Sequence, residues 1–118
     1  MSITLFGIAN CDTVKKARTW LEAHGISYVF HDFRKAGISA DLVAGWLKDV
    51  DWEVLVNRKG TTWRGLDIAR KEAIVDVASA TALMLESPAI VKRPVLLKDG
   101  RAHVGFNDDH YRQIFEKP

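Results

Sequence analysis

The sequence predicts an α/β domain built on a mixed sheet with flanking helices. Near its start, two runs rich in β-forming residues flank an amphipathic helix, which is the pattern of a βαβ unit with parallel strands. Near its end, Asp99-Gly100 lies between two further β-forming runs and predicts a hairpin, followed by a last helix. A helical block at approximately residues 38–87 separates these halves, so the expected order is β-α-β, helical block, β-β-α.

Length and composition limit the classes to which the chain can belong. Its 118 residues, 47% of them hydrophobic, suffice for a single domain over residues 1–118 with a buried core. The 17 basic and 15 acidic residues are interspersed with a net charge of +2, which favours a small anionic ligand over nucleic acid. A single cysteine excludes an intramolecular disulfide, and no Cys/His cluster predicts a metal site.

The expected location is the cytoplasm. One free cysteine fits a reducing compartment. The sequence enters its first predicted strand without a leader pattern, and no run approaches the ~18 apolar residues of a membrane span. We therefore expect a soluble monomer, with neither membrane nor nucleic acid among its partners.

The first predicted elements form the βαβ unit. Residues 3–8 have strand-like apolar spacing, residues 14–24 have helical spacing, and Gly25 is the expected C-cap. A run of β-forming residues at 26–30 predicts the second strand, parallel to the first.

The helical block follows a loop that the composition predicts at residues 34–37. A capped helix is expected at 39–47 and a shorter one at 52–55. Two more helical patterns occur at residues 68–74 and 78–85.

Strand patterns return in the last third of the chain. Residues 89–97 and 102–106 predict two antiparallel strands joined by the hairpin. Asn107 or Asp108 is the expected cap of the last helix.

Several prominent side chains are expected to be structural. Trp20, Trp46 and Trp52 lie on or near apolar helical faces, which predicts packing in the core. The histidines show neither metal-ligand spacing nor a relation to the cysteine, so surface or rim positions are expected. These histidines are His24, His31, His103 and His110.

The only cysteine, Cys11, lies between the first strand and the first helix, a position suited to a reactive thiol. Free N–H groups and the positive end of the helix dipole stabilise a thiolate there. Lys15, Lys16 and Arg18 add positive charge within about two turns. Asp12, the expected N-cap, opposes them. Such surroundings lower a cysteine pKa from ~8.5 to ~3.5–7.5, which predicts a nucleophile; the alternative is a small buried apolar residue without chemistry.

A second candidate site is the polar segment at residues 56–65, which lacks helical or strand periodicity. It brings Arg58, Lys59 and Arg64 together with two threonine hydroxyls. Forked guanidinium donors suit a carboxylate or an oxyanion, so the segment is a candidate anion-binding loop. A solvated connection with no ligand is the alternative.

The order of elements is typical of a thioredoxin-like fold with a helical insertion, and three motifs are more specific. They are N-C-D-T-V-K-K-A at residues 10–17, N-R-K-G-T-T-W-R at 57–64 and S-P-x-I-x-K-R-P-V at 87–95. Together they resemble the arsenate reductase (ArsC)-like family over essentially the whole chain. The most similar branch is that of YffB, to which the Spx/MgsR regulators are related.

The resemblance implies that Cys11 is the nucleophilic thiol and that two arginines bind and polarise an oxyanion or glutathione. It also implies that Pro94 follows a cis peptide bond and presents the preceding backbone to a peptide-like thiol. The expected set of glutathione- or substrate-binding residues is Arg58, Arg93, Pro94, Asn10, Lys15 and Arg64. No bound cofactor is expected, and glutathione is expected as a co-substrate.

Two departures from the family pattern narrow the expected chemistry. Arsenate reductases of this family have a third arginine after the final hairpin, where this sequence has Gly105, and this argues against arsenate as the substrate. The residue three after the nucleophile is serine in those enzymes and cysteine in the Spx redox switch, whereas it is Val14 here. The mechanism that remains is monothiol chemistry, in which Cys11 attacks a disulfide or oxidised thiol and external glutathione resolves the mixed disulfide.

The expected function is therefore that of an oxidoreductase, a glutathione-dependent thiol reductase. One alternative is an arsenate reductase that uses the same cysteine and arginines. A second is a non-enzymatic, Spx-like regulator that binds RNA polymerase, although one cysteine cannot form an intramolecular redox switch. A third is a thioredoxin-like binding module with a buried cysteine.

Overall fold

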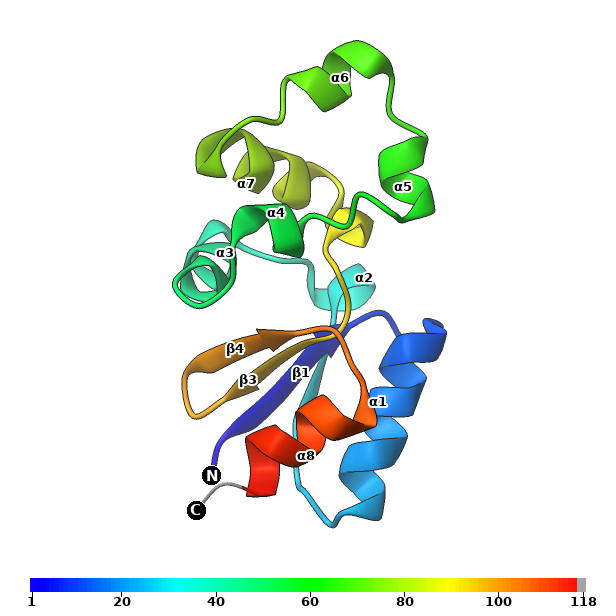
Figure 1. Ribbon diagram of the computed structural model, residues 1–118, viewed down its shortest axis with the longest axis vertical. Coiled ribbons are helices and arrows are strands. Elements are labelled where there is room, and N and C mark those ends of the chain that lie inside the picture. Colours follow the sequence, from blue (N-terminus) through cyan, green and yellow to red (C-terminus); the bar gives the residue numbers. More distant parts are fainter. Residues whose placement is uncertain (117–118) are drawn as a thin grey trace.

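The computed structural model describes residues 1–116 of the chain. The four-stranded sheet and the first and last helices form one lobe, here called the sheet lobe, and the helices inserted between residues 33 and 90 form the other, the helical lobe. The two lobes are stacked along the long axis, and the whole measures 45 × 26 × 26 Å (Figure 1). The sheet is mixed and lies between helices, which confirms the α/β class predicted from the sequence. None of the helices in residues 1–116 combines the length and hydropathy that crossing a bilayer requires.

The sheet has four strands in the order β2-β1-β3-β4. These strands are β1 (Ile3–Gly7), β2 (Val29–Asp32), β3 (Val95–Lys98) and β4 (Arg101–Val104). The central strand β1 pairs in parallel with β2 and antiparallel with β3, and β3 pairs antiparallel with β4. The predicted βαβ unit and the predicted hairpin are thus both confirmed.

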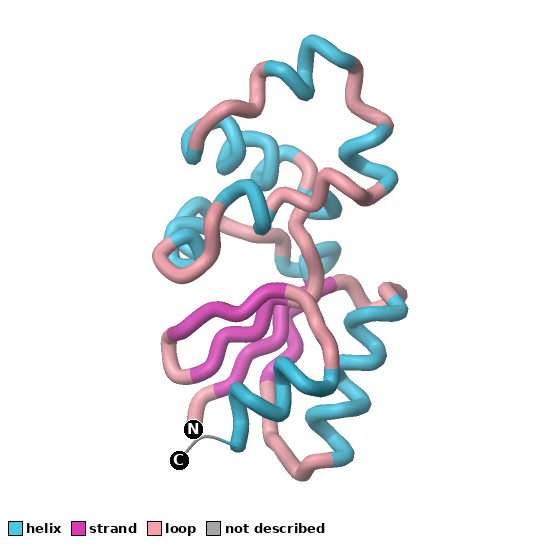
Figure 2. The backbone as a smooth tube through the Cα atoms, in the orientation of Figure 1, coloured by secondary structure: helices cyan, strands magenta, loops and turns pink. Residues whose placement is uncertain are grey.

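The helices form two groups on opposite sides of the sheet (Figures 1 and 2). One side is covered by α1 (Asp12–Ala23) and α8 (Asp108–Glu116). The other side carries the insertion, whose helices are α2 (Phe33–Ala36), α3 (Ala40–Leu47), α4 (Trp52–Leu55), α5 (Thr61–Arg64), α6 (Ile68–Glu72) and α7 (Val77–Glu86), with a 3-10 turn at Pro88–Ile90. The helices from α3 to α7 lie within the predicted helical block.

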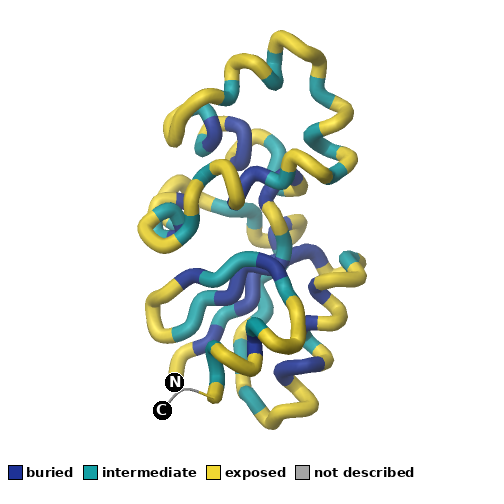
Figure 3. The backbone as a smooth tube through the Cα atoms, viewed as in Figure 1, coloured by how far each residue is buried: buried dark blue, intermediate teal, exposed yellow. Residues whose placement is uncertain are grey.

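Alternation along the strands divides the core into two layers. In β1, Ile3 and Leu5 join the cluster beneath α1 and α8, whereas Phe6 joins the cluster shared with the insertion. In β3, Val95 joins the cluster shared with the insertion, and Leu96 joins the cluster beneath α1 and α8. Because successive side chains of a strand point to opposite faces, the central strands supply both layers, and buried segments concentrate there (Figure 3).

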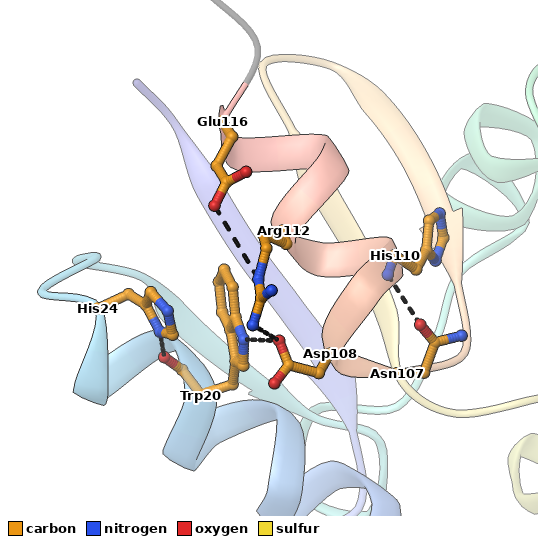
Figure 4. Close-up of polar contacts among 7 residues, drawn as sticks. All are labelled: Trp20, His24, Asn107, Asp108, His110, Arg112 and Glu116. Carbon is orange, nitrogen blue, oxygen red and sulfur yellow. Dashed lines mark hydrogen bonds and ion pairs between the residues drawn. The ribbon is translucent and has the colours of Figure 1, made fainter.

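The aromatic residues expected in the core are largely there. Trp46 is 1% exposed, and Trp20 is 8% exposed at the contact between α1 and α8. Trp20 stacks on His24 and donates its indole N–H to the Asp108 carboxylate at 3.1 Å, the same oxygen that Arg112 contacts (Figure 4). This junction holds α8 against α1.

Several predicted element boundaries are wrong. The second strand begins at Val29 instead of Ile26, because the Ile26 N–H donates to Leu21 O and completes the end of α1. Residues 34–37 were expected to be a loop, but α2 forms there because the Asp32 side chain caps it by accepting from the Arg34 N–H. The strand expected at residues 89–97 is confined to its end, since a 3-10 turn precedes it.

Short helical turns were the other source of error. The segment at residues 56–65 was expected to lack regular structure, yet α5 occupies part of it; four residues are too few to show a helical period. The helical pattern predicted at residues 78–85 is confirmed by α7, whose buried residues are Ala80, Leu83 and Met84.

Candidate thiol site

Cys11 lies where β1 turns into α1. It is the N-cap of α1, with extended backbone angles, and its carbonyl accepts the Lys15 N–H at 2.9 Å. The predicted N-cap, Asp12, is instead the first helical residue. Gly7 makes this geometry possible, because a Cβ there would lie 2.7 Å from a methyl carbon of Val14 in the first turn of α1. The glycine therefore lets the helix start close against β1.

The segment before β3 passes next to this turn. Its Arg93–Pro94 bond is cis, as the resemblance implies. The Pro94 carbonyl accepts the Gly105 N–H at 2.9 Å, which brings the turn between β4 and α8 to the same place. On its other side, Lys92 N–H donates to Leu55 O at 2.8 Å, which ties the segment to the helical lobe.

These segments enclose a pocket of about 360 Å³ around the thiol. Its walls come from parts of the chain that are remote in sequence. They include Cys11, Thr13, Asn57, Lys92, Arg93, Gly105, Phe106, Asn107 and His110. A cavity of this size is within the range of small-molecule sites.

The surroundings lower the pKa of the Cys11 thiol below its ordinary value. Burial is the largest single influence and raises this pKa, because it disfavours the charged form. The backbone N–H groups of Val14 and Thr13 and the guanidinium of Arg93 act in the opposite direction and together outweigh it. The thiol is thus half-buried, and its surroundings shift its ionisation toward the thiolate, the form that acts as a nucleophile.

The charge that stabilises this thiolate comes from a residue distant in sequence. The predicted contributions of Lys15 and Lys16 are not among the influences on Cys11, and both side chains are exposed. Arg18 points elsewhere: it donates to the Tyr28 hydroxyl at 2.9 Å and lies over the Phe30 ring. Arg93 therefore takes the role that the sequence assigned to the basic face of the helix.

Arg93 also has donor capacity to spare. One of its terminal nitrogens donates to the Ala89 carbonyl, and this contact orients the guanidinium. Its Nε is buried and has no hydrogen-bond partner within residues 1–116. Because this Nε has almost no accessible surface, a ligand in the pocket would meet the remaining terminal N–H groups of the guanidinium, which lines the wall.

Arg58 lies in a neighbouring hollow and not in the pocket of Cys11. Its guanidinium contacts Glu53 at 3.0 Å and lies over the Trp52 ring at 5.5 Å. The hollow holds about 360 Å³ and shares two wall residues, Asn57 and Lys92, with the Cys11 pocket. Because the two cavities adjoin, Arg58 can contact a ligand that extends out of the thiol pocket.

The remaining predicted binding residues are not brought to the thiol pocket. Asn10 and Lys15 are exposed and do not line it, and Arg64 is exposed at the end of α5. Pro94 is buried behind Arg93. For these residues, ligand binding stays a prediction from the resemblance.

Sequence reasoning missed other residues of the pocket. His110 was expected at an ordinary surface or rim position, but it lies in α8 on the side away from Trp20 and lines the thiol pocket (Figure 4). Asn57 and Lys92 belong to the motifs quoted above, so their place in those motifs was an available signal. His110 had no such signal, because only the packing of α8 brings it near Cys11.

Gly105 occupies a place where a side chain is disfavoured. Its φ is +83°, a left-handed conformation that suits glycine, and a Cβ there would lie 3.5 Å from Lys92 Cε. That distance is ordinary van der Waals contact, so the left-handed backbone, and not lack of space, is what disfavours a side chain at position 105.

The fold and this pocket define a class of protein: a thioredoxin-like α/β domain with a helical insertion and a half-buried cysteine thiol at the start of its first helix. Residues 6–114 match the sequence model of the ArsC family, so the chain belongs to the ArsC family.

The similarity extends over nearly the whole chain in several relatives. The structure of a protein named YffB has a TM-score of 0.90 and 46% identity, covering 95% of this chain and 97% of that one. An arsenate reductase (ArsC) related protein from Brucella melitensis has a TM-score of 0.77 and 52% identity, covering 99% and 97%. An uncharacterized protein of Haemophilus influenzae is 42% identical over 113 residues, 96% of this chain and 98% of that protein.

More distant similarity connects the chain to regulators. The global transcriptional regulator Spx of Streptococcus pyogenes serotype M1 is 25% identical over 117 residues, which are 98% of this chain and 86% of Spx. Relatives of this chain thus include both proteins named after arsenate reductase and transcriptional regulators.

Proposed function

We propose that this protein is a glutathione-dependent thiol reductase with Cys11 as its single nucleophile. The observation on which this rests most is the lowered pKa of a half-buried thiol that shares its pocket with the guanidinium of Arg93. A thiolate attacks disulfide sulfur, and a guanidinium donor binds a carboxylate or carbonyl oxygen of a peptide-like thiol.

The proposed reaction transfers the glutathionyl group in two exchanges. In the first, the Cys11 thiolate attacks the glutathione sulfur of a mixed disulfide, the old S–S bond breaks, and the substrate leaves as a thiolate that takes a proton from water. In the second, the thiolate of free glutathione attacks the glutathione sulfur held on Cys11. Oxidised glutathione leaves, and the Cys11 thiolate is restored. The substrate thiol is reduced, and its glutathionyl group ends in oxidised glutathione together with the second glutathione.

An external thiol is needed because Cys11 is the only cysteine in the sequence. The pocket and its neighbouring hollow together offer cations for the two carboxylates of glutathione. Arg93 and Lys92 lie at the thiol, and Arg58 lies in the next hollow. In this proposal the protein acts as a monomer, with glutathione as co-substrate and no bound cofactor.

Arsenate reduction is the second candidate, because the same thiolate and the same Arg93 guanidinium would also suit an oxyanion. The relative from Brucella melitensis is named after that enzyme. Gly105 offers no cation to the oxyanion, which favours the disulfide substrate.

The test measures formation of oxidised glutathione with two substrates, a glutathionylated small thiol and arsenate, and in a control without added oxidant. We expect turnover with the mixed disulfide that requires Cys11 and depends on glutathione concentration. Formation of oxidised glutathione with arsenate but not with the mixed disulfide would instead support arsenate reduction. If neither the mixed disulfide nor arsenate is turned over and the folded protein captures RNA polymerase, the enzyme proposal would be contradicted and an Spx-like role supported.

A further inference from the structure

A larger hollow lies beside the Cys11 pocket, on the side of the sheet edge. This hollow, about 520 Å³, lies between the β3–β4 hairpin and α8. His110 belongs to the walls of both cavities, so the two adjoin at that residue. A glutathione moiety at Cys11 would leave this second hollow free for another part of a substrate.

Basic side chains dominate the walls of the second hollow. Lys98 and Arg101 supply two permanent charges, and His103 and His110 face each other with ring centroids 5.8 Å apart. Within residues 1–116, neither Lys98 nor Arg101 lies within 4.0 Å of a carboxylate oxygen. Their charges are therefore available to a ligand.

Two acidic groups near the hollow, Asp99 and Asp49, keep their negative charge although each accepts a backbone N–H, so the wall itself has two permanent cations against one carboxylate. The Asp99 carboxylate, which is part of its wall, accepts the Ser2 N–H at 2.7 Å. Asp49, behind β4, accepts the Ala102 N–H at 2.9 Å. The positive field acts on His103, whose pKa is lowered by burial first and then by the charges of His110, Arg101 and Lys98, while Asp49 acts in the opposite direction.

We propose that the hollow lined by Lys98, Arg101, His103 and His110 is the docking site for an acidic segment of a protein substrate whose glutathionylated cysteine lies at Cys11. The proposal rests on the function proposed above and names its substrate class. The proposed occupant is a polypeptide because the hollow adjoins the thiol pocket, where the glutathionylated cysteine of the same chain would lie. A peptide whose acidic residues neighbour its modified cysteine can occupy both cavities at once.

Binding is tested first, without catalysis. Fluorescently labelled short peptides are prepared with a central glutathionylated cysteine and either glutamates or glutamines on both sides. Anisotropy with the Cys11→Ser protein, which cannot exchange thiols, measures their affinity. We expect the glutamate peptide to bind more tightly at low salt and the difference to shrink as salt rises.

A pair of matched variants locates the effect. K98Q/R101Q removes one lysine and one arginine from the hollow, and R34Q/K35Q removes the same charges from α2, where both side chains are exposed and line none of the three cavities described above. We expect K98Q/R101Q to weaken the glutamate peptide roughly threefold to tenfold and to leave the glutamine peptide nearly unchanged. R34Q/K35Q should retain the preference.

Other outcomes would overturn the proposal. Equal affinity for the two peptides would show that no acidic segment is recognised. Equal losses in the two double variants would show an effect of net charge alone, and competition by inorganic polyphosphate without any preference between the peptides would show a site for free polyanions. Turnover with active protein separates this inference from the proposed function: if the glutamate peptide binds preferentially but is not reduced, the reductase assignment fails and the docking site stands.

Discussion

The sheet lobe and the helical lobe support their parts of the site in different ways. In the sheet lobe, the side chains around Cys11 are closely packed, and Leu5, Val14 and Ala17 are fully buried. In the helical lobe, α5 and α6 have no buried residue, and Ile68 is 73% exposed. Figure 3 shows this contrast as exposed backbone along the end of the helical lobe.

This difference in packing assigns the two lobes different tasks: the sheet lobe sets the reactivity of the thiol, and the helical lobe contributes contacts to the ligand. The thiol and Arg93 lie on elements held by the sheet, which suits groups whose mutual geometry determines a pKa. Arg58 and Arg64 lie on a lightly packed segment of short helices, which suits groups that adjust to a ligand. We therefore expect changes in the sheet lobe to alter the chemistry and changes at residues 57–65 to alter affinity.

The largest expected effect comes from removing the nucleophile. Cys11→Ser should lower glutathione-dependent turnover by on the order of 10³-fold or more, because no second thiol can replace it. The thermal midpoint should change little, since the hydroxyl fits the same half-buried position. Turnover that survives in this variant would rule out Cys11 as the nucleophile.

Packing within the helical lobe can be compared with a pair of truncations, one in α7 and one in α6. Leu83→Ala should lower the free energy of unfolding by about 2–5 kcal/mol, because Leu83 is 1% exposed in the core shared with the sheet. Ile68→Ala should change it by less than about 0.5 kcal/mol, since that side chain is solvent-exposed. Urea denaturation measures both, and similar losses would contradict the contrast between the buried face of α7 and the lightly packed α6.

Arg93→Gln should raise the pKa of Cys11, because the guanidinium favours the thiolate. Alkylation by iodoacetamide rises with pH and levels off above the thiol pKa; in the wild type we expect this below ~8.5, and in the variant at higher pH. At pH values below the pKa of both proteins, the variant should react more slowly because less of its thiol is ionised, while the plateau rate is unchanged. Arg93→Lys, which keeps the charge, is the control. A profile identical to that of the wild type would show that Arg93 does not stabilise the thiolate.

The smallest expected effect on activity is at Arg58, in the hollow next to the thiol pocket. Arg58→Gln should raise the KM for a glutathione mixed disulfide roughly threefold to tenfold through loss of one exposed ionic contact, with unchanged alkylation of Cys11. Glu53→Gln is the matched control, because it breaks the same ion pair but leaves the guanidinium. If both variants raise KM equally, Arg58 acts by supporting local structure and not by binding the ligand.

Local patterns were sufficient for much of the fold. The βαβ unit, the hairpin at Asp99-Gly100 and the helix α7 each produce a periodicity or a turn signal within a few residues, and all three are present. The errors occur at α2, α5 and the start of β2, where a cap or a helix end involves only one or two hydrogen bonds. Such short features leave no period for a pattern to detect.

By itself, the sequence determined the fold class and the place of Cys11 at the start of a helix, because both depend on neighbours along the chain. Only the tertiary structure decided which charge acts on that thiol. Coulomb interaction depends on distance in space, so Arg93 affects the pKa whereas Lys15, closer in sequence, does not. The same applies to His110, which joins the pocket through the packing of α8, and to Arg58, which lies in the neighbouring hollow.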